Sequence, residues 1–340
     1  MIVLHLLQAS DPGGAQTVVR SLVEGLKPRG IRSVVALPGG GPMMRALDAA
    51  GADVVALPLD RLSARTLREV AHLAMVSGAD VLHGHGKSSG LYARLAARRL
   101  GLPSIVTVHG LHRRIGWTWL DRRLARLGTL VHVSEAQAQE ALAAGIEGRP
   151  TLVIPNGVDP EWLQASALSR DTARRRLGLP PTGRIIGVVA RLDPVKCIEI
   201  LLDAIAQTPD ALLAIIGWGP EAQRLAFHAV TKSTPSRIRW LGPLPEAWRY
   251  LRAFDAVASA SAKEGCPMAI LESLALGVPV IASSIPAHDE ILGPGSTVRP
   301  GRWAAWMAPP MTALIPTVLP ARYRLDAMLA AYARAYGAAA

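Results

Sequence analysis

The chain has 340 residues, of which 50% are hydrophobic and 19% charged, and its formal net charge is +11. This apolar content excludes a mainly disordered chain, and the length favours two domains because single cores seldom grow beyond about 300 residues. Aromatic residues amount to only 4%, too few for base-stacking surfaces, so we expect no nucleic acid as a partner.

The chain begins with an apolar run that ends at Gln8 and carries no basic leader. We interpret this run as a buried strand rather than a signal peptide. No apolar run of about 18 residues follows, as a membrane-spanning helix would require. The two cysteines, Cys197 and Cys266, are too few for a disulfide framework, so we expect a cytoplasmic protein.

Short apolar runs rich in strand-forming residues alternate with helical patterns along the first half. These runs predict strands at residues 2–7, 33–37, 54–57, 81–83, 105–108, 130–133 and 152–154. The patterns between them predict helices at residues 15–26, 67–76, 91–100 and 135–144, among others. Because the strands are apolar on both faces, the alternation predicts a parallel sheet covered by helices on each side.

The pattern breaks at residues 156–181, where prolines surround a charged stretch, and then resumes. Further strands are predicted at residues 185–189, 212–216, 238–241, 256–259 and 278–282. One sheet of all these strands would be unusually wide, so we predict an α/β protein with two doubly wound Rossmann-like domains facing each other across a cleft. The expected domains are residues 1–165 and 166–320, followed by a C-terminal helix in residues 321–340 that can pack back on the first.

The most informative motif lies where a predicted strand turns into a helix. Glu264 and Glu272 stand eight residues apart there, and Gly265, Cys266 and Pro267 follow the first of them. A helix start presents free backbone N–H groups that attract anions; the glycine permits close approach, and the proline suits the first helical position. The motif suits a ligand with hydroxyls and a diphosphate. The alternative is a pair of solvated charges on an ordinary helix.

Arg191 and Lys196 follow the strand predicted at residues 185–189. Breaking a sugar–phosphate bond leaves a nucleoside diphosphate, whose charge must be stabilised by a metal or by fixed cations. The chain contains no Asp-x-Asp pair, so we favour fixed cations and expect neither metal nor other cofactor. The alternative is a surface arginine and lysine beside a turn. Together with the carboxylates, these cations predict a nucleotide-sugar site.

Taken in order, the motifs resemble glycosyltransferase family 4, retaining enzymes of GT-B architecture. The matching segments are residues 13–16, 107–110, 133–134, 156–159, 191–196, 216–220, 264–272 and 277–281. They extend over nearly the whole chain, which makes the resemblance more specific than any single motif.

The resemblance implies a role for each matching residue. Arg191 and Lys196 would bind the donor diphosphate, Glu264 would hold the transferring sugar, Glu272 the ribose, and His109 would contact the sugar at the reaction centre. The residues assigned to catalysis are His109, Arg191, Lys196 and Glu264. Those assigned to the donor are Gly13, Gly14, Gly217, Gly219, Gly265, Cys266, Pro267 and Glu272. A strand-ending histidine such as His109 is alternatively a polar cap.

The chain departs from the family pattern at two cysteines and at residues 291–298. Cys197 stands where the family usually has glycine, and Cys266 where it has a bulkier apolar residue. Their places beside a lysine and at a helix start favour thiolates, so we expect a nucleoside diphosphate to protect both from alkylation.

His83 and His85 form a second histidine motif. The sequence places no third ligand near them, so we predict no metal site. The same segment ends like a phosphate-binding P-loop, but Val81 occupies the position of its first glycine, which argues against an NTPase.

Residues 112–126 combine paired arginines with two tryptophans, and residues 1–150 carry most of the excess positive charge. We assign Arg113, Arg114, Trp117 and Trp119 to an acceptor or membrane surface, where a basic amphipathic helix meets anionic lipid. The alternative is an ordinary helix whose apolar face packs in the first domain.

The expected function is metal-independent transfer of a hexosyl group, with retention, from a nucleotide diphosphate sugar to a saccharide or lipid-linked saccharide. The setting would be cell-surface polysaccharide, lipopolysaccharide or glycolipid synthesis, with peripheral contact at the inner face of the membrane. Two alternatives stay open: a sugar-nucleotide epimerase of similar architecture, and a non-catalytic nucleotide-binding member.

Overall fold

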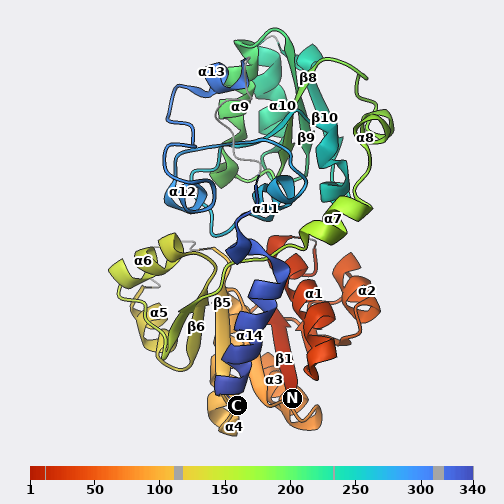
Figure 1. Cartoon of the computed structure of the whole chain (residues 1–340). Coiled ribbons are helices and arrows are strands. Elements are labelled where there is room, and N and C mark those ends of the chain that lie inside the picture. The colour runs from red at the N-terminus through yellow and green to blue at the C-terminus, as the bar shows by residue number, and fades with distance from the viewer. Residues whose placement is uncertain (12, 111–117, 233, 309–317, 340) are drawn as a thin grey trace. The chain divides into compact units, whose positions relative to one another are not determined.

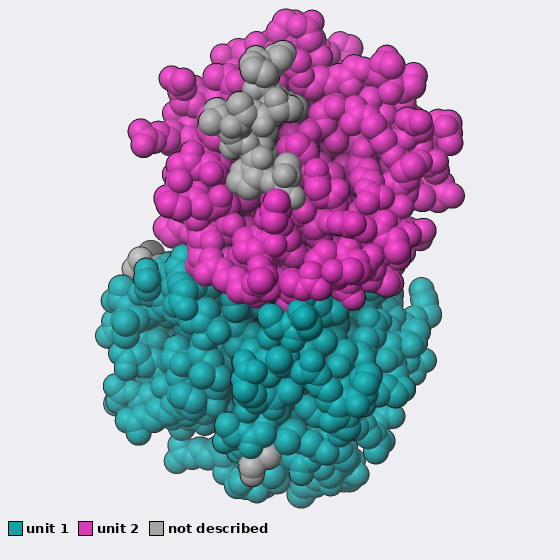
Figure 2. All heavy atoms as spheres, in the orientation of Figure 1, with its two compact units in different colours: residues 1–157, 325–340 teal, residues 158–324 magenta. Residues whose placement is uncertain are grey.

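The computed structural model describes residues 1–11, 13–110, 118–232, 234–308 and 318–339. These residues form two compact units, one of residues 1–157 and 325–340 and one of residues 158–324 (Figure 2). Each unit has its own parallel sheet, with helices between successive strands (Figure 1). The prediction of two Rossmann-like domains is therefore confirmed.

Within the described residues, the sheet of the first unit has seven parallel strands in the order β3-β2-β1-β4-β5-β6-β7. Its strands are β1 (Ile2–Leu7), β2 (Arg32–Leu37), β3 (Asp53–Ala56), β4 (Val81–His85), β5 (Ser104–Val108), β6 (Thr129–His132) and β7 (Thr151–Val153). Its helices are α1 (Gly14–Leu26), η1 (Lys27–Arg29), α2 (Pro42–Ala49), α3 (Ala64–Val76), α4 (Lys87–Leu100), α5 (Thr118–Ala125), α6 (Glu135–Ala143) and α14 (Leu325–Ala339). The strand order reverses between β1 and β4.

The second unit has five parallel strands in its described part, in the order β10-β9-β8-β11-β12. The strands are β8 (Arg184–Val189), β9 (Ala211–Ile216), β10 (Ile238–Gly242), β11 (Ala256–Ser259) and β12 (Val280–Ala282). The helices are α7 (Pro160–Ser166), α8 (Arg170–Arg176), η2 (Pro194–Lys196), α9 (Ile198–Ala206), α10 (Ala222–Thr231), η3 (Pro235–Arg237), η4 (Ala247–Ala253), α11 (Met268–Ala275), α12 (Pro286–Leu292), α13 (Trp303–Met307) and η6 (Ala321–Tyr323). Here the order reverses between β8 and β11, and such reversal points are where open α/β sheets bind ligands.

Strands buried on both faces explain why the apolar runs predicted the sheets so well. Each predicted strand is present, and its ends differ from the predicted ones by at most two residues. On β1, Leu4 and Leu6 pack in one cluster with α3 and α4, while Leu7 packs in a second cluster with Val19 and Val23 of α1. Each such fully buried side chain contributes about 2 kcal/mol of transfer free energy.

The first unit ends at Gly157, earlier than the expected boundary at residue 165. Asp159 caps α7 by accepting a hydrogen bond from the Trp162 amide at 2.9 Å. The helix then contacts α11 and η4, so it belongs to the second unit. The chain returns to the first unit at Leu325 through α14, which contacts α1 (Figure 1).

The charged stretch that breaks the sequence pattern forms α8, and one of its arginines is buried. Arg174 is only 1% exposed; its Nε donates to the Ala253 carbonyl at 2.8 Å, and one terminal nitrogen lies 3.0 Å from a carboxylate oxygen of Asp255. The other terminal nitrogen donates to the carbonyls of Pro181 at 3.0 Å and Gly183 at 3.2 Å. This guanidinium therefore holds α8 and the chain leading into β8 against η4 and β11.

Candidate active site

The centre of the second unit's site is an ion pair between the loops that follow β8 and β11. Nζ of Lys196 lies 2.5 Å from Oε1 of Glu264, and the two side chains are 22% and 11% exposed. These loops leave the sheet at the strand-order reversal, where ligand sites are expected. The sequence assigned both residues to a donor; the structure shows in addition that they pair with each other.

Serine hydroxyls and a backbone hydrogen bond fix this pair. The Ser261 hydroxyl donates to the same Glu264 oxygen at 2.6 Å, and the Ser283 hydroxyl donates to the Ser261 carbonyl at 2.5 Å. The Ala262 amide donates to the Val195 carbonyl at 2.9 Å, which ties the β11 loop to η2. Sequence reasoning missed both serines. Ser261 lies shortly after β11 and Ser283 directly after β12, and these places near strand ends were the only signal for them.

Arg191 is the exposed cation of this edge. Its side chain is 72% exposed, and its Nε lies 3.2 Å from a carboxylate oxygen of Asp193, two residues along the same loop. Exposed ion pairs contribute little, about 0–1 kcal/mol, so the guanidinium can exchange this partner for a ligand phosphate at low cost.

The start of α11 has the character of an anion site. Pro267 is the N-cap residue, with extended backbone, and no side chain caps the helix among the described residues. The prediction of Pro267 at the first helical position is therefore off by one residue, because the helix begins at Met268. The uncapped amides and the helix dipole favour negative charge here. Gly265 and Cys266 are buried between Glu264 and this helix start.

Glu272 lies on α11 and is half-buried. Burial raises the pKa of its carboxyl to about 7. No hydrogen bond or ion pair to this carboxylate is found in the described part of the chain. A half-buried carboxylate without a partner is costly, and hydrogen bonds from ligand hydroxyls would lower that cost.

Close backbone packing requires glycine at positions 217 and 219. A Cβ on Gly217 would lie 1.8 Å from the Ala190 carbonyl oxygen, and one on Gly219 would lie 2.4 Å from that of Leu192. The Leu192 amide also donates to the Trp218 carbonyl at 3.0 Å. The loop after β9 therefore packs directly on the loop after β8, which carries Arg191, and glycine is required there with or without a ligand.

The backbone at Cys197 explains why the family usually has glycine at this position. Its φ of 48° and ψ of 42° lie in the left-handed region, where glycine is the least strained residue. Burial, followed by the nearby Glu199 carboxylate, raises the pKa of the Cys197 thiol. The expectation of a thiolate at Cys197 is therefore wrong, because the thiol is desolvated and faces a negative charge.

In the first unit, the residues that the sequence assigned to the site follow β1 and β5. Gly13 is the N-cap of α1, Gly14 is its first residue, and both are exposed. His109 directly follows β5 and is half-buried. Burial lowers the pKa of His109 to about 4, so the ring is neutral at pH 7 and can bind a ligand through hydrogen bonds but not through charge.

The structure also brings His5 next to the second histidine motif. His5, His83 and His85 are buried, and one nitrogen from each lies within 4.8 Å of the others. The argument that no third ligand stands near His83 and His85 is therefore wrong, because β1 pairs with β4 and aligns His5 with His83. Three neutral imidazoles at this spacing are a set that can bind a transition metal.

Of the residues assigned to an acceptor or membrane surface, Arg113, Arg114 and Trp117 lie outside the described residues. Trp119 lies on α5, is 60% exposed, and carries the Arg123 guanidinium over its ring at 5.1 Å. Among the described helices, none has the length and apolar character needed to cross a bilayer.

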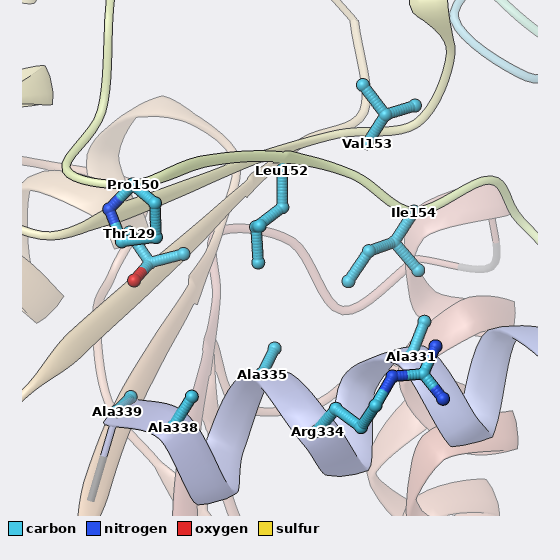
Figure 3. Close-up of a pocket in the computed structure, with 10 residues that line it drawn as sticks. All are labelled: Thr129, Pro150, Leu152, Val153, Ile154, Ala331, Arg334, Ala335, Ala338 and Ala339. Carbon is cyan, nitrogen blue, oxygen red and sulfur yellow. The ribbon is translucent and has the colours of Figure 1, made fainter.

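A separate pocket of about 330 Å³ lies in the first unit between β7 and α14. Figure 3 shows Leu152 and Ile154 opposite small side chains of α14, including Ala335, with Arg334 at one side. None of the predicted site residues lines it.

Comparisons with known proteins match both halves of the chain. Residues 12–162 match the family model Glycosyltransferase Family 4, and residues 169–308 match Glycosyl transferases group 1. An Escherichia coli UDP-Gal:alpha-D-GlcNAc-diphosphoundecaprenol alpha-1,3-galactosyltransferase is 29% identical over 228 residues, which is 62% of this chain and 59% of that protein. A D-inositol 3-phosphate glycosyltransferase of Mycolicibacterium gilvum is 32% identical over 61% of this chain and 51% of its own length.

These matches therefore span between half and three fifths of the two curated relatives. Among solved structures, Anabaena HepE in complex with UDP-glucose superimposes with a TM-score of 0.88, covering 99% of this chain and 100% of that one at 22% identity. At this identity the likeness shows the fold alone. The two family matches, the two parallel sheets and the glycosyltransferase relatives agree, and the chain belongs to glycosyltransferase family 4, with the two-domain GT-B fold.

Proposed function

We propose that this protein is a retaining hexosyltransferase that uses a nucleoside-diphosphate sugar as donor. The observation that carries the proposal is the Lys196–Glu264 pair beside the start of α11. Its members suit the two parts of such a donor, since an ammonium group binds phosphate and a carboxylate accepts hydrogen bonds from sugar hydroxyls. HepE, which has the same fold, was crystallised with UDP-glucose, a donor of this class.

On donor binding, the diphosphate takes Lys196 away from Glu264 and draws Arg191 away from Asp193. The uncapped amides of α11 add partial positive charge, with the backbone of Gly265, Cys266 and Pro267 close to the phosphates. Glu264, released from the lysine, accepts hydrogen bonds from the hexose. Glu272 accepts hydrogen bonds from the ribose, which gives a role to a carboxylate that has no partner among the described residues.

The reaction breaks the bond between the anomeric carbon and the diphosphate oxygen, and the electron pair stays on that oxygen. The acceptor hydroxyl attacks the same face of the sugar, and its proton passes to the released diphosphate oxygen. Lys196 and Arg191 stabilise the charge that develops there, so neither a covalent nucleophile nor a metal is needed. In the first unit, Gly13 and Gly14 serve the diphosphate, and His109 contacts the transferring sugar.

The acceptor we propose is a saccharide or a lipid-linked saccharide of a cell-surface polysaccharide or glycolipid. The E. coli relative is named for a diphosphoundecaprenol-linked acceptor and the mycobacterial relative for an inositol phosphate, so acceptors differ among relatives. The basic, tryptophan-bearing segment at residues 112–126 favours the lipid-linked class, at the inner face of the membrane. Absence of co-sedimentation with anionic liposomes at low salt would count against this membrane contact.

The test is a donor panel that includes UDP-glucose and UDP-galactose, scored first by thermal shift and then by product formation, with the anomeric configuration read by NMR. We expect Lys196→Ala to lower turnover about a hundredfold or more, as for loss of a preorganised electrostatic group, and EDTA to leave turnover unchanged. Near-wild-type turnover in Lys196→Ala would overturn the assignment. An epimerised donor formed without acceptor would identify an epimerase, and binding without turnover a non-catalytic member.

A further inference from the structure

Three histidines of the first unit form a hydrogen-bonded chain that runs from the centre of the sheet to His109. Nδ1 of His5 lies 3.1 Å from Nε2 of His85, and Nδ1 of His85 lies 3.2 Å from Nε2 of His109. The ring planes of His5 and His109 are tilted by only 25° and 22° from that of His85, and their centroids lie 5.4 Å and 5.5 Å from its own. His5 and His85 are fully buried, at 0% and 2% exposure.

The three hydrogen-bonded histidines are uncharged, and this restricts which of their nitrogens carry protons. Burial lowers the pKa of His5 to about 3, that of His109 to about 4 and that of His85 well below its ordinary value. A neutral imidazole carries one N–H and one bare nitrogen. Because both nitrogens of His85 are used in the chain, it must donate to one neighbour and accept from the other.

Only two arrangements of protons satisfy both contacts. In the first, all three rings are protonated on Nδ1, so that His5 donates to His85 and His85 donates to His109. In the second, all three are protonated on Nε2 and both hydrogen bonds reverse. The tautomer of His109 is therefore determined by rings that lie deeper in the unit.

The two outer nitrogens of the histidine chain, on His5 and His109, distinguish the two arrangements. Nε2 of His5 and Nδ1 of His109 are buried and have no hydrogen-bond partner among the described residues. The second arrangement would leave an N–H of His5 permanently unpaired in the core, and orphaned buried N–H groups are rarer than bare acceptors. The first leaves only a bare nitrogen there and places the remaining N–H on His109, next to the end of β5, where a ligand oxygen can accept it.

We infer that His85 and His5 are positioning residues that hold His109 in its Nδ1–H tautomer, so that His109 donates a hydrogen bond to an oxygen of the bound sugar and does not act as a base. The part that concerns the sugar rests on the proposed function. The coupling between the three tautomers does not, because it follows from the two N···N contacts alone; the preference for the Nδ1–H form also needs an acceptor at His109, which in the first arrangement is an oxygen of a bound ligand.

A metal site formed by His5, His83 and His85 is the competing interpretation. Nδ1 of His83 lies 2.7 Å from the Tyr336 hydroxyl and its Nε2 lies 2.8 Å from the Thr107 hydroxyl, so both already have partners. Both nitrogens of His85 are occupied as well. A metal would have to break several of these hydrogen bonds, so the geometry favours the chain, and metal binding becomes an outcome of the test.

The test is heteronuclear NMR of the protein labelled with ¹⁵N-histidine. Ring ¹⁵N shifts separate protonated from bare nitrogens, and couplings between nitrogens across N–H···N bonds identify the partners. We expect Nδ1 to be protonated in His5, His85 and His109, with couplings from His5 to His85 and from His85 to His109. Protonation of His109 on Nε2, or absence of both couplings, would overturn the inference.

Variants at His85 show whether the histidine chain sets the tautomer. His85→Phe keeps a ring in the core but removes the donor to His109, so the His109 Nδ1 signal should move toward the bare position. His85→Asn keeps a donor at similar reach and should restore the protonated position; exposed His72→Gln is the matched control and should change nothing. An unchanged His109 in His85→Phe would refute positioning, and stoichiometric zinc binding that shifts His5, His83 and His85 together would establish the metal site instead. These readouts require no transferase activity, so the inference can fail while the proposed function stands.

Discussion

Replacing Glu264 by glutamine tests what the Lys196–Glu264 pair does before a donor binds. The two charged atoms lie 2.5 Å apart, and the side chains are 22% and 11% exposed, so the contact is a partly buried, charge-assisted hydrogen bond. Such bonds contribute about 1.5–3 kcal/mol. A diphosphate that binds Lys196 must first displace this partner.

In Glu264→Gln the lysine has lost its charged competitor, while the side chain keeps its size. Since about 1.4 kcal/mol corresponds to a factor of ten, we expect UDP to bind at least about tenfold more tightly than to the wild type. Turnover of a UDP-sugar should nevertheless fall about a hundredfold or more, because the hexose has lost its charged acceptor. Calorimetry with UDP and steady-state kinetics measure the two effects on the same preparation.

Two further variants serve as controls for this prediction. Lys196→Ala should weaken UDP binding, because it removes the cation itself. Ser261→Ala removes the hydroxyl that donates to the same Glu264 oxygen at 2.6 Å but leaves both charges, so its effect on UDP affinity should be much smaller. If Glu264→Gln weakens UDP binding as Lys196→Ala does, the pair does not compete with the diphosphate and the reasoning is refuted.

Cys197→Gly should raise the free energy of unfolding by up to about 1 kcal/mol, because glycine adopts the left-handed φ of 48° without strain; a lower urea midpoint would contradict this. Arg174→Met should cost about 3 kcal/mol or more, since it removes the buried partner of Asp255 and of several carbonyls, whereas exposed Arg175→Met should change stability by less than about 0.5 kcal/mol. Because burial raises the pKa of Glu272 to about 7, UDP affinity should fall up to about tenfold from pH 8 to pH 6, as the carboxylate that accepts the ribose hydroxyls is protonated. Glu272→Gln should lose this part of the pH dependence, and an identical pH profile would exclude Glu272 as its source.

The strands could be predicted because parallel strands are buried on both faces and appear as apolar runs. The ends were less certain: β4 was predicted to stop at His83 but continues through Gly84 and His85. Neither of these residues favours a strand by itself. Pairing with β1 on one side and β5 on the other overrides that preference, and local sequence does not record such neighbours.

That Lys196 and Glu264, both assigned to the donor, lie at one edge of the sheet was also predictable, since loops after strands of a doubly wound sheet meet there. The contact between Lys196 and Glu264 was not, because residue type and loop position do not give side-chain conformation. The buried role of Arg174 was hidden for a similar reason. Its hydrogen-bond acceptors come from residues 180–183, Ala253 and Asp255, which lie outside its own helix. The sequence of that helix alone therefore does not distinguish Arg174 from the other arginines beside it.

Strand pairing brings together the histidines and a threonine that the sequence shows only as separate motifs. His83 and His85 alternate along β4, and the register aligns His5 of β1 with His83 and Thr107 of β5 with His85, so all four share one face of the sheet. Buried polar groups on such a face need hydrogen-bond partners from whatever covers it.

Helix α14 supplies these partners from the far end of the chain. The Tyr336 hydroxyl lies 2.7 Å from Nδ1 of His83, and the Tyr332 hydroxyl lies 2.9 Å from the Thr107 hydroxyl. Both tyrosines are almost fully buried, and their spacing of four residues places them on the same side of the helix. The return of the chain to the first unit thus has a chemical reason as well as a packing one. An all-apolar helix in this place would leave His83 and Thr107 without these hydroxyls.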